Sequence, residues 1–142
     1  MSFDLKLENG DLKISNTGDL QLVRDNEKLR QDVLKILITP LGGNKSQPWY
    51  GSSVNSTLIG GVFDREFTMD AATQQVKSAI DNLQIMQKTQ ARTQNVTAAE
   101  SIVAIQDVYI NSNPQNRRTI ELKVSILTGA LTTLDVGFYV TL

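Results

Sequence analysis

The segment "TIELKVSILTGALTTLDVGFYVTL", residues 119–142, carries the clearest secondary-structure pattern in the chain. In each half, apolar residues alternate with charged, polar or small ones, which is typical of a strand with one buried face. The link through Thr128-Gly129-Ala130 favours a turn, so the segment predicts an antiparallel hairpin. The residues expected to face one way are Ile120, Leu122, Val124 and Ile126 on the first strand, and Leu134, Val136, Phe138, Val140 and Leu142 on the second.

Two other regions also have strand character. In "VAIQDVYIN", 103–111, Ile105 and Val108 fall on opposite parities, which predicts a β-bulge or a mixed environment. The first 24 residues alternate apolar and polar side chains and contain Asn-Gly and Gly-Asp separators, which suit tight turns. We expect this N-terminal region to form a small β-meander.

Two longer segments show the helical spacing of apolar residues. The first covers about 26–38, is expected to be capped by one of residues 25–26, and is ended by Pro40. The second covers about 69–91, with Thr68 as its expected cap. Strands at both ends and helices between them are typical of an α+β fold.

Two shorter segments complete the predicted fold. "TAAE", 97–100, matches a capping box and predicts a turn or two of helix. "VNSTLIGGVF", 54–63, fits either a short strand or an apolar lead-in to the long helix. We therefore expect residues 1–142 to form one domain, in which the N-terminal β-meander, two main helices and the C-terminal antiparallel β-hairpin make a single sheet covered by helices.

The composition excludes several classes of function. The 142 residues include no cysteine and no histidine, which removes thiolate metal sites, disulfides and the usual general base near neutral pH. Fourteen basic and fifteen acidic residues give a net charge of −1, which is too weak to attract nucleic acid or anionic lipid. The sequence shows no secretory signal and no stretch of 18 apolar residues, so we expect no membrane partner.

The loop "TPLGGNKSQPWYGSS", residues 39–53, contains the only tryptophan and two of the three prolines. Its glycines follow a helix C-terminus, whereas a phosphate-binding loop needs them before a helix N-terminus. Pro48 stiffens the chain before Trp49 and Tyr50, and Gly51 permits a sharp bend after them. The aromatic pair is expected to fold over the domain's own core, to dock a partner, or to do both.

No residue set in the sequence predicts catalysis. Asp64 and Glu66 lie in a polar stretch, and the capping box explains Glu100, so no acid pair of the glycosidase type is singled out. A serine nucleophile would have no histidine base. The acidic spacing of "DREFTMD", 64–70, does not match a calcium loop. We therefore expect no catalytic residue, no metal, no cofactor and no small-molecule substrate.

Several of these stretches together resemble a known family. "GDL", the helical "LRQDVLKILITPLG" and the loop motif "PWYGSSV" are similar to the pattern of baseplate wedge proteins of contractile-tailed bacteriophages. That family is often called lysozyme-like and has relatives in type VI secretion baseplates. The resemblance covers most of the chain and is sharpest in "ITPLG…PWYGS".

The resemblance implies a structural role in the virion, at the inner baseplate of the tail. Its implied partners are other wedge proteins, tube-proximal baseplate proteins and the tail sheath, whose first ring would assemble on this protein. The residues expected to bind the wedge proteins are Thr39, Leu41, Gly42, Trp49, Tyr50 and Gly51. The residues expected to pair with sheath strands are Leu134, Val136, Phe138 and Val140, because the last strand is predicted at a sheet edge, where a further strand can add.

The sequence departs from the family pattern at one place. Many members carry Gly-Glu-Arg after the first helix, and the charged pair helps to bind the wedge core. Here Gly42 is followed by Gly43 and Asn44. The loop would therefore have to bind by shape, backbone hydrogen bonds and aromatic contact, or the contact with the wedge would be made elsewhere. Two alternatives remain open: a peptidoglycan hydrolase using acids such as Asp64 and Glu100, and a stand-alone regulatory binding module.

Overall fold

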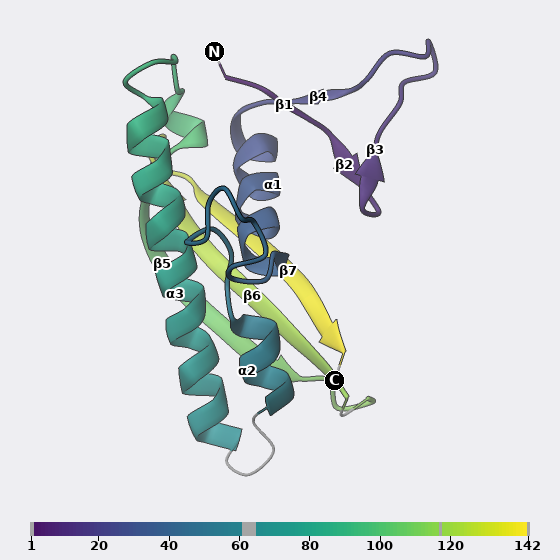
Figure 1. Ribbon diagram of the computed structural model, residues 1–142, viewed down its shortest axis with the longest axis vertical. Coiled ribbons are helices and arrows are strands. Elements are labelled where there is room, and N and C mark those ends of the chain that lie inside the picture. The colour runs from purple at the N-terminus through teal and green to yellow at the C-terminus, as the bar shows by residue number, and fades with distance from the viewer. Residues whose placement is uncertain (1, 61–64, 117, 142) are drawn as a thin grey trace.

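A three-stranded antiparallel sheet forms the centre of the protein. The computed structural model describes residues 2–60, 65–116 and 118–141. The strands of the sheet are Ile102–Ser112 (β5), Thr119–Thr128 (β6) and Thr133–Thr141 (β7). Their order is β5-β6-β7, so β6 is the middle strand and β5 and β7 are the edges (Figure 1).

The predicted C-terminal hairpin is confirmed. Ile126 pairs with Leu134 and Ile120 with Val140, which keeps the apolar side chains of both strands on one face. The Thr128 amide donates to the Thr132 carbonyl at 2.9 Å and closes the turn. On β6 the inward side chains are fully buried, and each such burial contributes about 1.5–3 kcal/mol. Residue 142 lies outside the described residues.

The irregularity expected in the preceding strand is also confirmed. The pairing of β5 with β6 shifts register between Ile102 and Ala104, and again between Ile105 and Asp107. Each shift leaves an extra residue on β5, which disturbs the ladder locally. The β6–β7 pairing has no such shift. The two edges of the sheet therefore differ in regularity.

Helices cover one face of this sheet. They are α1 (Asp25–Ile38), α2 (Val54–Gly60) and α3 (Arg65–Gln90). α1 packs against β7, α3 packs against β5, and both pack against each other (Figure 1). The core between them includes Leu29, Val33, Ile36, Val76, Ile80, Leu83, Leu122, Val124, Ile126 and Val136. On the opposite face of the sheet, Tyr109, Lys123, Asp135 and Tyr139 are exposed.

Both predicted helix caps are wrong. The residue before α1 is Arg24, which makes no side-chain capping bond, and the Asp25 carboxylate instead accepts a hydrogen bond from Thr97 Oγ1 at 2.7 Å. α3 begins at Arg65, so Thr68 lies within the helix. Apolar periodicity missed this first turn because its large apolar residue, Phe67, is exposed.

The segment after the loop forms a helix, so the short strand given as one alternative for 54–63 is wrong. In α2, Val54 and Leu58 are spaced four residues apart and are both buried. This spacing places them on one helical face, which packs against α3. Residues 61–63 of the predicted segment lie outside the described residues.

The N-terminal region is an arm that stands apart from the central sheet (Figure 1). Its short strands are Asp4–Leu5 (β1), Leu7–Glu8 (β2), Asp11–Leu12 (β3) and Leu22–Val23 (β4). β1 pairs with β4 and β2 with β3, so the described strands form three sheets and the expected single sheet is not found among them. Asn9 and Gly10 both have positive φ and form a tight turn, which pairs β2 with β3. The α+β class itself is confirmed.

Candidate functional site

Backbone hydrogen bonds close the base of the 39–53 loop. The Ser52 amide donates to the Thr39 carbonyl at 2.9 Å, and the Leu41 amide donates to the Ser52 carbonyl at 3.1 Å. The Ser52 hydroxyl donates to the Leu37 carbonyl at 2.5 Å, near the end of α1. The two ends of the loop are therefore tied to each other and to the helix. Thr39 serves this base and is only partly exposed.

Gly51 is required where the two ends of the loop run side by side, joined by a parallel bridge between Pro40 and Ser52. Its φ is +119°, in the region that favours glycine. A Cβ at this position would lie 2.6 Å from the Thr39 carbonyl oxygen and 2.9 Å from that of Pro40. Gly51 is also buried, so it shapes the loop from within and does not offer a contact surface.

Tyr50 points inward from the loop. Its ring is half-buried and packs against the core formed by the helices and the sheet. Burial raises the pKa of its hydroxyl above the ordinary value of 10.0, with Lys35 opposing the rise and Asp32 and Asp4 adding to it. Tyr50 therefore packs the loop against the domain's own core, which is one of the two roles predicted for the aromatic pair.

Trp49 points outward and remains 45% exposed. Its ring meets that of Tyr50 edge to face, with 6.2 Å between the ring centroids. It also borders a hollow of about 390 Å³, whose other walls come from Gln47 and from Asn82, Ile85 and Met86 of α3. Leu41 and Gly42 are exposed as well. Of the predicted wedge-binding residues, Leu41, Gly42 and Trp49 thus lie at the surface, while Thr39, Tyr50 and Gly51 mainly support the loop.

The structure corrects the roles expected of the last strand. Leu134, Val136 and Val140 are buried and Phe138 is half-buried, because these side chains pack toward α1. The side chains of Leu134, Val136 and Val140 are therefore covered by the protein itself, and only that of Phe138 remains partly exposed. What remains open on β7 is its backbone, since β6 is the only described strand that pairs with it.

The register shows which backbone groups of β7 are open. Thr128 and Thr132 form a hydrogen-bonded pair, and such pairs recur at every second residue of an antiparallel ladder. Leu134, Val136, Phe138 and Val140 therefore bond inward to β6. The N–H and C=O groups of Asp135, Gly137 and Tyr139 point to the free edge.

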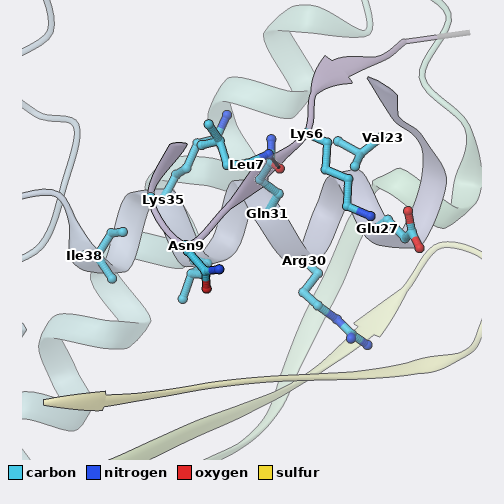
Figure 2. Close-up of a pocket in the computed structure, with 11 residues that line it drawn as sticks. Lys6, Leu7, Asn9, Val23, Glu27, Arg30, Gln31, Lys35 and Ile38 are labelled. Carbon is cyan, nitrogen blue, oxygen red and sulfur yellow. Dashed lines mark hydrogen bonds between the residues drawn. The ribbon is translucent and has the colours of Figure 1, made fainter. Parts of the chain in front are cut away.

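A glutamine on α1 holds the N-terminal arm, and the sequence pattern assigned it no role. Gln31 Nε2 donates to the Leu5 carbonyl at 2.8 Å, and Gln31 Oε1 accepts from the Leu7 amide at 2.9 Å. Figure 2 shows this side chain reaching from α1 to the arm. The side-chain amide of Gln31 thus bonds the Leu5 carbonyl and the Leu7 amide, two backbone groups at a strand edge that another strand could otherwise bond. Only the tertiary structure brings these residues together, across more than twenty positions.

A chain of charges continues this attachment. Lys28 pairs with Asp32 at 2.7 Å, Asp32 with Lys35 at 3.3 Å, and Lys35 with Asp4 at 2.5 Å. Burial opposes the charged forms of Asp4 and Lys35. Their mutual hydrogen bond and attraction, helped by Asp32 beside Lys35 and by the Leu5 amide and Gln31 beside Asp4, outweigh this cost. The pKa of Asp4 is therefore lowered below 3.8 and that of Lys35 is raised above 10.5.

The arm keeps an apolar face in solvent. A hollow of about 330 Å³ lies between parts of the arm and α1, and Leu7, Val23 and Ile38 are among the residues that line it (Figure 2). The exposed apolar side chains of the arm are Phe3, Leu7, Leu12, Ile14, Leu20 and Leu22. Hydrogen bonds and an ion pair attach the arm to α1, and among the apolar side chains of the arm Val23 of β4 is buried.

The acidic residues considered for hydrolysis do not form an open pair among the described residues. Glu100 is 1% exposed, and its Oε2 accepts a hydrogen bond from Ser2 at 2.5 Å. Its expected role in a capping box is wrong, because Thr97 bonds Asp25 and makes no capping bond in the short 3-10 helix Ala98–Glu100. Asp64 lies outside the described residues, and Glu66 is exposed.

Two further features of the described chain bear on ligands and membranes. No group of three or more acidic side chains in the described ranges is placed to hold a metal ion. Across those same ranges, none of the helices combines the length and apolarity needed to cross a bilayer.

Comparison with family models, curated proteins and solved structures found no match to this chain.

Replacement of Gly51 tests the loop base. Gly51→Ala is expected to lower the free energy of unfolding by at least about 1 kcal/mol, because the methyl group meets two carbonyl oxygens and φ is positive. Urea denaturation measures the change. Gly42→Ala is the matched control, since φ is also positive there but the space is open. Equal losses in the two variants would contradict the close approach at Gly51.

The Asp4–Lys35 pair predicts how attachment of the arm depends on pH. Because the pKa of Asp4 is lowered in the folded state, its contribution is present above 3.8 and is lost as pH falls through the folded value. The raised pKa of Lys35 means that its contribution is present below 10.5 and is lost as pH rises through the folded value. NMR titration of the Asp4 carboxyl should give a midpoint below 3.8. That midpoint should return toward 3.8 in Lys35→Met but not in Lys88→Met, and an unchanged midpoint in Lys35→Met would rule out the pair as its cause.

Proposed function

We propose that this protein is a structural component of a contractile phage tail baseplate, which links the inner wedge to the tail and initiates sheath assembly by strand addition. It acts in the virion, without catalysis or a cofactor, after assembly in the host cytoplasm. Its partners are other wedge proteins, tube-proximal baseplate proteins and the sheath protein. Nucleic acid, membrane and small-molecule substrates have no part in the proposal.

The observation that carries the proposal is the free edge of β7. Every second residue of β7 over 135–139 has its backbone N–H and C=O groups directed outward, namely Asp135, Gly137 and Tyr139. An exposed, regular edge is a template for another strand. Natural proteins commonly blunt such edges with bulges, and the opposite edge of this sheet, β5, has two of them. The contrast supports β7 as the edge that receives a partner.

The loop supports the second half of the proposal, attachment to the wedge. Its base is closed by backbone bonds and its inner ring packs on the core, so Trp49 is displayed from a fixed position. Trp is among the residues most enriched at interface hot spots. The hollow beside it is lined by apolar and uncharged polar side chains. The surface formed by Trp49 and this hollow fits a contact made by shape and aromatic packing. Such a contact suits a loop that lacks the Glu-Arg pair carried by many members of the family it resembles.

Strand addition is tested by removing a single outward donor. Tyr139→Pro deletes an N–H that points away from β6, and proline is tolerated on an edge strand in that orientation. We expect baseplates carrying this variant to lack sheath, as counted by electron microscopy of tails. Tyr139→Val keeps the backbone N–H at this position, so baseplates that carry this variant should assemble sheath normally. Normal sheathing with a folded Tyr139→Pro protein would refute strand addition at β7.

Wedge attachment is tested at Trp49. Trp49→Ala is expected to weaken co-purification with wedge proteins by at least about tenfold, the scale of a hot-spot aromatic. Trp49→Phe, which keeps a ring over α3, should lose less. Unchanged co-purification combined with lower thermal stability would make Trp49 a packing residue and not an interface residue.

A further inference from the structure

A glycine in the middle of β7 has no explanation within its own strand. Gly137 does not have a positive φ. A Cβ built on it would meet only the Leu122 carbonyl oxygen, at 3.4 Å, which is an ordinary contact. Glycine weakens a strand interior and often marks a site where another molecule approaches closely. Position 137 therefore has room for a side chain that the protein itself does not supply.

The empty position lies on the solvent-facing side of the sheet. Gly137 alternates with the inward residues of β7 and pairs with Lys123 of β6. Asp135 and Tyr139 stand on either side of it on the same face, and Tyr139 is 67% exposed. The same face is hollowed nearby by about 420 Å³, with Tyr109 and Lys123 among the lining residues. The hollow is also lined by Asp107, Glu121 and Ser125. A bulky group placed over Gly137 would thus meet Lys123 and aromatic rings, with carboxylates farther along the face.

One end of this face is acidic. Ser125 pairs with Asp107 on one side and with Asp135 on the other, so two carboxylates flank one hydroxyl. The Ser125 hydroxyl donates to Asp135 Oδ1 at 2.6 Å. Within the described ranges, neither carboxylate has an ion-pair partner. At the outer edge, Asp135 is therefore open to a cation on an added strand.

The backbone register connects these two features. The outward N–H and C=O groups belong to Asp135, Gly137 and Tyr139, so an added strand would place residues beside these three. Neighbouring side chains on one face of paired strands interact, and opposite charges stabilise the pair. The side chains beside Asp135 and Gly137 would then contribute directly to the choice of partner.

We propose that the strand recognised by β7 carries a bulky ring side chain beside Gly137 and a lysine or arginine beside Asp135, with apolar residues between them on the core face. This inference rests on the proposed function, because it names the partner strand that β7 would accept. The ring fills the space above Gly137 and packs over Lys123 and its aromatic neighbours. The cation neutralises the edge carboxylate.

Synthetic peptides test this rule on the full-length protein. The probe is Thr-Val-Lys-Val-Trp-Val-Lys-Val-Thr, which reads the same in both directions, so the ring faces Gly137 whichever way the peptide adds. Two comparison peptides replace both lysines by glutamate or the tryptophan by alanine. Fluorescence anisotropy measures affinity, and hydrogen exchange reports protection of the Asp135, Gly137 and Tyr139 amides. We expect the probe to protect these amides and to bind roughly fivefold or more tightly than either comparison peptide.

Variants of the protein assign the preference to named residues. Asp135→Lys should reverse the choice between the lysine and glutamate peptides, whereas Asp19→Lys, the same charge change on the exposed arm, should leave it unchanged. Gly137→Val should remove the advantage of tryptophan over alanine by filling the space, and valine favours strand conformation. Equal affinities for all three peptides, or no amide protection by any of them, would overturn the inference.

The experiments distinguish two failures. One is that β7 does not prefer a strand with a ring beside Gly137 and a cation beside Asp135, and the other is that β7 does not bind the sheath. If the three peptides bind equally but Tyr139→Pro abolishes sheath assembly, the inferred preference of β7 is wrong and the proposed function is supported. If peptides rank as expected but Tyr139→Pro tails sheath normally, β7 selects strands of this pattern from another partner, and the sheath role is wrong.

Discussion

Burial of a single face of the β5–β6–β7 sheet is the constraint on which the other features depend. α1 and α3 cover that face, and the inward side chains of β6 and β7 fill the space beneath them. Because side chains alternate along a strand, the remaining residues of β7 face solvent. In this register the solvent-facing residues are also those whose backbone groups point to the free edge. Burial of this one face of the sheet therefore determines both which side chains of β7 are exposed and which of its backbone hydrogen-bonding groups point to the free edge.

The loop after α1 serves two purposes because its base is closed. Backbone bonds between Thr39 and Ser52 hold the ends together, and Gly51 lets the two ends run closely side by side. Tyr50 can then pack inward while Trp49 is displayed beside α3. Neighbouring aromatic residues that point in opposite directions explain why composition alone left both roles open.

The N-terminal arm is held by different forces from the core. Its attachment to α1 relies on the Gln31 amide and on the ion pair between Asp4 and Lys35, while much of its apolar surface is exposed. Polar contacts at a partly exposed site contribute modestly to stability and depend on pH and salt. The arm is therefore expected to open more readily than the sheet, whose inward residues are fully buried.

Elements with strong periodicity could be predicted from the amino-acid sequence. Alternation over 119–142 predicted the hairpin and its inward face, helical spacing predicted α1 and most of α3, and the parity change near Ile105 and Val108 predicted the irregular edge. These signals are local, because each reflects the burial of one face of one element. The helix caps and the start of α3 were predicted wrongly, because Asp25 and Thr97 bond each other across the fold and the exposed Phe67 adds no periodic signal.

How the elements meet became visible in the folded chain. The tertiary structure separated the arm from the central sheet, paired Gln31 with a strand edge, divided the roles of Trp49 and Tyr50, and showed that β7 offers its backbone while its apolar side chains are buried. These features join residues far apart in the chain, and their hydrogen bonds and close approaches leave no periodic trace in the sequence. The physical reason is that periodicity records which face of an element is buried, but not which other element buries it.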